Sequence, residues 1–326
     1  MTGPSPAVAA TRLAVRADLS RLPAGAHVLV GCSGGPDSLA LAAAVGFEAP
    51  RAGIQASGVV VDHDLQRGSC HVAQRAAAQC RELGLDPVEV VTVRVANQGD
   101  GPESAARRAR YAALEDAALR RGADRVLIGH TRDDQAEQVL LGLARGSGPR
   151  SLSGMPRTRG LFVRPFIALG RADTVAACAA YGLEPWLDPQ NADPGSRRVR
   201  ARAVLGTLEA ELGPGVIEAL ARSADMIRED ADYLEQRACD TRAGLGPGPY
   251  SASALLTLPR PLRTRVWRLL ALEQGSGPGS LTSAHVESLD ALLTSWHGQG
   301  PLNLPGGVLV RRTGDRICIG GSGPVE

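Results

Sequence analysis

Four apolar runs rich in β-branched residues, each followed by a segment with helical periodicity, constrain the fold of this chain most. The runs are 27–32, 56–63, 88–95 and 124–130, and the helical segments are 38–45, 70–83, 103–122 and 135–146. This alternation predicts an α/β fold with a parallel sheet covered by helices on both faces. Ligands of such sheets bind at the carboxyl ends of the strands. Three polar stretches, "SGGPDS", "VDHD" and "GHTRDD", lie at those ends.

The pattern loosens after Gly148, which predicts a second and smaller domain. An amphipathic run extends from Gly215 to Ala238, and residues 241–250 have the glycine and proline content of a linker. Two helical stretches and two short strand-like segments, "GGVLVRR" and "DRICIG", follow. We expect a catalytic domain over 1–214 and a smaller, mainly helical domain over 215–326, with the boundary between 215 and 250.

The first polar stretch has the features of a phosphate-binding turn. It consists of Ser33, Gly34, Gly35, Pro36, Asp37 and Ser38. The glycines expose backbone N–H groups, the proline suits the first turn of a helix, and a helix start attracts anions. The serines add hydroxyl donors, and the aspartate suits Mg²⁺ held against a phosphate. A plain strand-to-helix turn with a capping serine is the alternative.

The composition excludes several kinds of protein. The 326 residues contain no lysine, so no lysine nucleophile, Schiff base or P-loop lysine is available. The six cysteines are scattered without a Cys-x-x-Cys pair, which argues against a zinc ribbon or redox dithiol. The net charge of +2 indicates neither nucleic-acid nor acidic partners. No apolar run reaches about 18 residues and no secretory pattern begins the chain, so we expect a cytoplasmic protein.

The stretch "SGGPDS" resembles the PP-loop, S-G-G-x-D-S, of the N-type ATP pyrophosphatases. The resemblance implies an adenine nucleotide alpha hydrolase-like domain that uses ATP and Mg²⁺ and cleaves between the α and β phosphates. It places the pyrophosphate end of ATP on residues 33–38, with Mg²⁺ on Asp37. The adenine is expected near the backbone of the second strand end, at Val61 and His63.

Four further stretches are similar to the tRNA(Ile)-lysidine synthetases. They are "GHTRDDQAEQVLLGLARGSGPRSLSGM", "VDHDLQRGS", "AARRARY" and "WLDPQNADPGSRRVRAR", with departures from the family pattern at Gln66, Gln138, Gln190 and Val199. The resemblance covers about residues 25–235, and the last 25 residues match more loosely. It implies ATP-dependent adenylation of the wobble cytidine of a CAU-anticodon tRNA(Ile), followed by attack of L-lysine at C2 and release of AMP.

Two carboxylates form the expected lysine site. Asp134 and Glu137 are three apart on one helix face, with His130 just before them. Such a pair could hold an ammonium or Mg²⁺, or form a solvated helix start; the resemblance favours lysine or Mg²⁺ contacts and a catalytic role for all three residues. A zinc site made of the same three residues lacks further ligands.

Arginines supply the expected anion contacts. Arg107 and Arg110 share a helix face and would stabilise the α-phosphate, although an exposed basic helix is the alternative. The expected tRNA contacts are Arg197, Arg198, Arg200 and Arg202, which could equally form a solvated linker. The same question arises at Arg260, Arg263, Arg265 and Arg268.

Three rival functions remain open at this stage. A tRNA thiolase would share the fold, but the missing Cys-x-x-Cys argues against it. A small-molecule amidating synthetase would use ATP without RNA. A catalytically silent ATP- or tRNA-binding protein is the third. The oligomeric state is open, with a homodimer among the assemblies considered.

Overall fold

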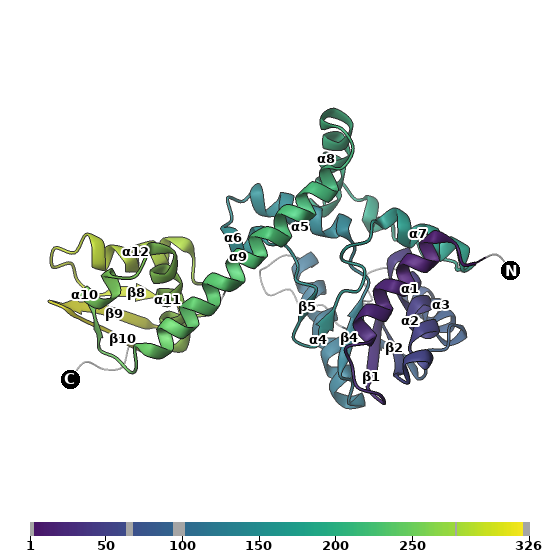
Figure 1. The fold of residues 1–326 in the computed structure, drawn as a ribbon, viewed down its shortest axis with the longest axis horizontal. Coiled ribbons are helices and arrows are strands. Elements are labelled where there is room, and N and C mark those ends of the chain that lie inside the picture. The colour runs from purple at the N-terminus through teal and green to yellow at the C-terminus, as the bar shows by residue number, and fades with distance from the viewer. Residues whose placement is uncertain (1–2, 63–67, 94–101, 278, 322–326) are drawn as a thin grey trace. The chain divides into compact units, whose positions relative to one another are not determined.

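The chain forms two compact units. The computed structural model describes residues 3–62, 68–93, 102–277 and 279–321 (Figure 1). The units are Met1–Ile227 and Arg228–Glu326, so the division falls inside the interval 215–250 in which the sequence places a boundary. Within the described ranges, no helix has the length and apolar character needed to cross a membrane.

The first unit contains a six-stranded sheet in the order β3-β2-β1-β4-β6-β5. Its strands are β1 (His27–Cys32), β2 (Gln55–Asp62), β3 (Val88–Thr92), β4 (Arg125–Ile128), β5 (Thr158–Arg159) and β6 (Phe162–Val163). All neighbours pair in parallel except β5, which runs antiparallel to β6. The parallel sheet predicted from the sequence is confirmed, and the four longest strands coincide with the four apolar runs.

Helices cover both faces of this sheet, as expected. They are α1 (Pro6–Leu19), α2 (Pro36–Glu48), α3 (Ser69–Glu82), α4 (Pro102–Arg121), α5 (Arg132–Leu143), α6 (Pro149–Leu152), α7 (Arg171–Ala180), α8 (Arg197–Leu212) and the start of α9 (Val216–Gly244), with short 3-10 turns at Pro50–Ala52 and Pro189–Ala192. Residues of α1, α2, α3 and α7 share one apolar core, and residues of α4 share another.

The central strand β1 shows why the sheet must be covered twice. Val28 and Val30 belong to the core with α1 and α2, whereas Leu29 belongs to the core with α4. An added Cβ at Gly31 would lie 3.2 Å from Leu114 of α4, so this helix packs directly on the strand backbone. A strand that is apolar on both sides is the pattern of a buried parallel sheet.

The second unit combines helices with an antiparallel sheet in the order β7-β10-β9-β8. Its elements are β7 (Tyr250–Ser251), α10 (Ala252–Leu256), α11 (Arg260–Glu273), α12 (Ser283–Thr294), β8 (Leu302–Leu304), β9 (Val308–Thr313) and β10 (Arg316–Gly321). Trp267 is fully buried in its core. The linker expected over 241–250 is shorter than predicted: α9 continues to Gly244 and β7 begins at Tyr250, so residues 245–249 connect them.

Candidate functional site

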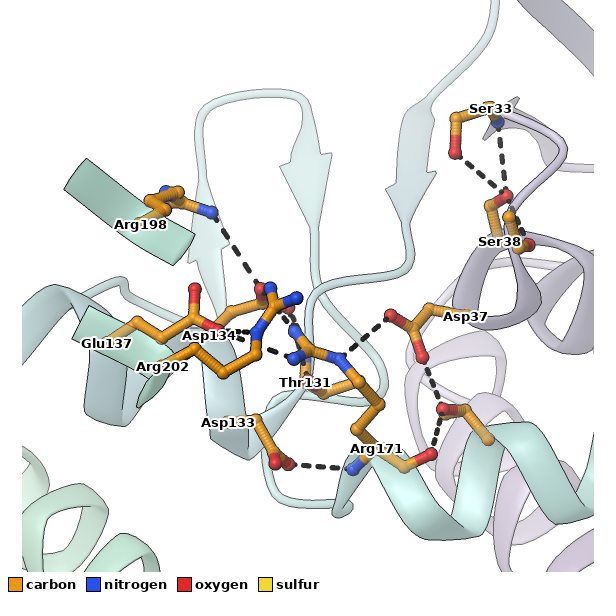
Figure 2. A network of polar contacts seen from close by, with 12 residues as sticks. Ser33, Asp37, Ser38, Thr131, Asp133, Asp134, Glu137, Arg171, Arg198 and Arg202 are labelled. Atoms are coloured by element: carbon orange, nitrogen blue, oxygen red, sulfur yellow. Dashed lines mark hydrogen bonds and ion pairs between the residues drawn. The ribbon is translucent and has the colours of Figure 1, made fainter. Parts of the chain in front are cut away.

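The turn between β1 and α2 has the geometry expected of an anion-binding loop. Gly34 has φ +81°, and an added Cβ would lie 3.2 Å from Ala76, so only glycine fits there. Gly35 is the N-cap of α2 and supplies no side-chain cap, which leaves the first N–H groups free. Ser38 Oγ accepts from Ser33 N (3.1 Å) and donates to Gly35 O (3.0 Å), which holds the turn closed (Figure 2).

A close backbone contact places the end of β4 against this turn. A Cβ added at Gly129 would lie 2.9 Å from the carbonyl oxygen of Asp37 and 3.1 Å from Ser38 N. The glycine therefore lets the strand end reach the first turn of α2. Because of this contact, the chain that follows β4 begins α5 beside Asp37.

The cap of α5 fixes the position of Asp134. Its Oδ2 accepts from Thr131 N (2.8 Å) and Thr131 Oγ1 (3.2 Å), in the manner of a capping box. Its Oδ1 accepts from Arg171 Nη2 at 3.0 Å. Burial acts to raise the pKa of Asp134, but the charges of Arg171 and Arg198 and the Thr131 N–H outweigh it and the pKa is lowered. The carboxylate is therefore charged, buried and directed into the site.

Glu137 lies one turn further along the same helix and is fully buried. Its Oε1 accepts from Arg202 Nε (2.9 Å) and from Arg171 Nη1 (3.4 Å). Its Oε2 is buried and has no hydrogen-bond donor among the described residues. Asp134 and Glu137 thus share the Arg171 guanidinium, as their helical spacing predicts, and one carboxylate oxygen is left without a partner.

Arg171, the first residue of α7, connects the two carboxylates to the phosphate loop. Figure 2 shows its guanidinium between Asp37 and the pair formed by Asp134 and Glu137. Its Nε lies 3.7 Å from Asp37 Oδ2, and its backbone N donates to Asp133 Oδ2 at 2.7 Å. A cation is unfavourable in the first turn of a helix, so these carboxylates compensate its position.

Asp37 has an environment that disfavours its own charge. Burial raises the pKa of its carboxyl to about 6, and Asp134 and Asp133 add to the increase, while the hydrogen bond from Thr174 and the charge of Arg171 oppose it. Three carboxylates near one point create a negative potential, and the Arg171 guanidinium is the cation of the chain that partly compensates it.

The residues Arg107, Arg110 and His130 form a basic group beside Asp134. Burial lowers the pKa of both guanidiniums, and Asp134 opposes that decrease. Burial also lowers the pKa of His130 to about 3, and its Nδ1 has no partner among the described residues. The imidazole is therefore neutral, and the basic group carries its charge on arginines.

The four arginines at the start of α8 point in two directions. Arg198 Nη1 lies 3.8 Å from Asp134 Oδ1, and Arg202 Nε lies 2.9 Å from Glu137 Oε1. Arg197 and Arg200 are exposed, and Arg200 donates to backbone carbonyls of the preceding loop. One pair thus reaches the carboxylates, and the other faces solvent, where a phosphate backbone would be accessible. Val61 is partly buried in β2, and His63 lies outside the described residues.

The residues around Asp37 suit a Mg²⁺ ion that is shared with substrate phosphates, and they do not suit a metal held by protein ligands alone. Mg²⁺ prefers oxygen ligands and is often held by one or two carboxylates together with substrate phosphates. No cluster of three or more His, Cys, Asp or Glu in the described chain has metal-binding geometry. Asp37, next to the phosphate loop, supplies one such carboxylate.

Sequence reasoning missed Arg171, Thr174 and Arg164 as residues of the site. Thr174 Oγ1 donates to Asp37 Oδ1, and Arg164 belongs to the basic group. Two signals in the sequence were available. An arginine opens the helical segment 171–180, where a cation is unfavourable, and "FVRPF" contains one charge inside an apolar run.

The comparisons place these features in a known class. A family model for the PP-loop domain matches residues 11–208, so the fold and the loop belong to the PP-loop class. A model for the TilS substrate binding domain matches residues 251–318. The chain is 52% identical to a tRNA(Ile)-lysidine synthase from Thermobifida fusca over 98% of this chain and 99% of that protein. It is 49% identical to the one from Streptomyces coelicolor over 97% and 99%. The chain belongs to the tRNA(Ile)-lysidine synthase family, which confirms the resemblance seen in its motifs.

A solved structure of a U34-tRNA thiolase from Methanococcus maripaludis is similar to this chain. The TM-score is 0.58, with 20% identity over 68% of this chain and 80% of the other. This likeness confirms the α/β fold alone. At that identity it carries no statement about the reaction.

Proposed function

We propose that this chain ligates L-lysine to C2 of the wobble cytidine of a CAU-anticodon tRNA(Ile), with ATP as the activating substrate. The observation that carries the proposal is the pair of buried carboxylates on α5. Asp134 and Glu137 lie beside a phosphate-binding turn, and Glu137 Oε2 is buried with no donor in the part of the chain that the structure describes. An ammonium group has three donors and no acceptor, so it complements this oxygen.

The reaction follows in two balanced steps. The cytidine O2 forms a bond to the α-phosphorus of ATP, and the bond from that phosphorus to the pyrophosphate oxygen breaks. The lysine ε-nitrogen then bonds to C2, the C2–O bond breaks, and AMP leaves with the former O2. The amine must lose its protons to a neighbouring base or to water.

Separate groups of residues bind the pyrophosphate end and the α-phosphate of ATP. Backbone N–H groups in the first turn of α2, such as those of Asp37 and Ser38, and the Ser33 and Ser38 hydroxyls bind the pyrophosphate end of ATP at residues 33–38, with the adenine near Val61 and His63. Mg²⁺ held by Asp37 would neutralise the charge on the departing pyrophosphate. Arg107 and Arg110 stabilise the α-phosphate, and His130 lies beside them as a neutral catalytic imidazole.

The tRNA is held by both parts of the chain. Arg197, Arg198, Arg200 and Arg202 of α8 bind its phosphates, and Arg197 and Arg200 are exposed and lie outside the ion pairs with Asp134 and Glu137. Residues 215–326 recognise the tRNA, a role supported by the substrate binding domain matched at 251–318.

The test is incorporation of labelled lysine into purified tRNA. We expect incorporation that requires ATP and Mg²⁺ with tRNA(Ile) bearing CAU and none with tRNA(Met), which shares the triplet. Absence of incorporation into the cognate tRNA by folded protein contradicts the proposal. Release of pyrophosphate with sulfur transfer in place of lysine would favour a thiolase.

Glu137→Gln tests the lysine site itself. The variant keeps the shape of the side chain and removes the charge, so we expect the KM for lysine to rise by about 100-fold, since a charge-assisted contact contributes about 1.5–3 kcal/mol. Pyrophosphate release in the first step should continue. Glu89→Gln is the matched control, because Glu89 also pairs with two arginines, Arg120 and Arg121, but on β3. An unchanged KM in the Glu137 variant contradicts the assignment.

A further inference from the structure

Arg164 is a buried cation of the site to which the proposed function assigns no role. It directly follows β6, and only 4% of its surface is exposed. Its Nη1 donates to the carbonyl oxygen of Pro156 at 2.8 Å, and its Nη2 lies 3.5 Å from Tyr111 Oη. Its Nε is buried and has no acceptor among the described residues.

Tyr111 joins Arg164 to the basic group on α4. Its hydroxyl oxygen accepts from Arg107 Nη2 at 3.2 Å and lies within reach of Arg164 Nη2. The guanidiniums of Arg107 and Arg110 lie 5.0 and 5.9 Å from the centre of the tyrosine ring. Three arginines from two distant segments of the chain therefore surround one aromatic side chain.

The three guanidiniums of this cluster have no carboxylate of their own among the described residues. Arg107, Arg110 and Arg164 form no ion pair within the ranges that the structure describes. Asp134, the carboxylate that acts on the pKa of Arg107 and Arg110, is already paired with Arg171. Buried charges are ordinarily paired. Next to them, His130 Nδ1 is a second buried atom without a partner.

We propose that Arg164, together with Arg107 and Arg110, forms a three-guanidinium site for one phosphodiester of the reacting nucleotides. Arginine is suited to this because its planar fork matches phosphate oxygens. The unpartnered Nε of Arg164 and the hydroxyl proton of Tyr111 supply further donors to the same anion. The inference deepens the proposed function by adding a third and wholly buried arginine to the phosphate contacts.

Two phosphates of the reaction have the required chemistry. One is the α-phosphate, which becomes a diester when it joins adenosine to the cytidine O2. The other is the backbone phosphate beside the wobble nucleotide. Binding experiments with the full-length chain distinguish them without any turnover, so the result does not depend on lysine incorporation.

The experiment compares Arg164→Gln and Arg164→Lys with wild type in two binding assays. The first measures affinity for AMP and for adenosine, which lacks the phosphate. The second measures affinity for the tRNA over a range of salt concentrations, without nucleotide. Arg157→Gln is the matched control, since Arg157 lies on the same β-hairpin, its carbonyl accepts from Arg164 N, and its side chain pairs with Asp18.

Loss of an α-phosphate contact should remove at least about tenfold of the preference for AMP over adenosine, because a charged hydrogen bond contributes about 1.5–3 kcal/mol. Loss of a backbone contact should instead weaken tRNA binding and reduce the slope of log K against log salt by about 0.7. Arg164→Lys should retain part of either effect. The inference is overturned if both folded variants bind AMP and tRNA like wild type.

A measurement on the wild-type chain covers the case in which the variants do not fold. Phenylglyoxal labels guanidiniums, and mass spectrometry reports labelling at Arg164. AMP or tRNA should protect Arg164 against this reagent, with Arg157 as the internal reference. Labelling of Arg164 that occurs without ligand and is reduced by neither AMP nor tRNA would also overturn the inference. Failure of lysine incorporation with intact protection would instead count against the proposed function alone.

Discussion

At the scale of single residues, the site contains a cluster of buried carboxylates, around Asp134, and a cluster of buried arginines, around Arg107 and Arg110. Asp134 caps α5 with one carboxylate oxygen and accepts from Arg171 with the other. This side chain therefore connects the start of α5 to Arg171, which also pairs with Asp37 and Glu137. His130, between that group and the arginines, stays neutral because burial and the nearby guanidiniums oppose its protonation. Local helix chemistry therefore determines where each charge points.

The buried His130 should make the first unit sensitive to acid. Its pKa is about 3 in the folded chain, below the ordinary value of 6.5. Between these two pH values the unfolded chain binds the extra proton, so stability is present above about pH 6.5 and falls as pH decreases, by up to about 1.4 kcal/mol per pH unit. We expect His130→Asn to show a smaller loss of stability from pH 7 to pH 5.

Urea unfolding at several pH values measures this difference. His71→Asn is the control, because His71 is exposed on α3 and should not affect the slope. The same slope for wild type and His130→Asn would show that acid acts on other groups.

At the scale of elements, the junction between β4 and α2 positions the site. Gly129→Ala would place a Cβ 2.9 Å from the Asp37 carbonyl oxygen, against backbone that cannot turn away. We expect a loss of about 1–3 kcal/mol in the free energy of unfolding, as in other overpacked sites, and weaker nucleotide binding because the first turn of α2 shifts. Calorimetry and titration with AMP measure both effects.

Gly206→Ala is the matched control for that change. Gly206 lies in α8 with no atom within 4 Å of an added Cβ. Alanine should therefore stabilise this helix by up to about 1 kcal/mol. If Gly129→Ala behaves like Gly206→Ala, the contact between β4 and α2 does not position the site.

The extent of sequence-based prediction also differs between elements. The strands were predictable because β1 to β4 are rich in β-branched apolar residues. Asp134 and Glu137 were predictable because helical spacing fixes a shared face. Arg171 and Arg164 were not, since their roles depend on α7 and β6 reaching Asp37 and Tyr111 through the fold. The linker expected at 241–250 is shortened at its start because α9 tolerates Gly244 at its end, where glycine is common.

At the scale of the whole molecule, the chain has separate apolar cores in its two units. The second unit buries Trp267 and the strands β9 and β10 in a core of its own. Its helices α11 and α12 are joined by the buried pair of Arg263 and Asp290, with distances of 2.6 and 3.0 Å between their side-chain atoms. Separate cores predict that unfolding is not a single two-state transition.

Asp290→Ala should therefore lower one calorimetric transition and leave the other in place. Removing one partner of a buried ion pair costs about 3–5 kcal/mol, which would lower the transition of the second unit by at least about 10 °C. AMP should still raise the transition of the first unit. Asp240→Ala is the control, because its pair with Arg237 is 3.8 Å long and about half exposed, so an effect below about 1 kcal/mol is expected. A single transition that moves with both the substitution and AMP would instead mean that the two units unfold together.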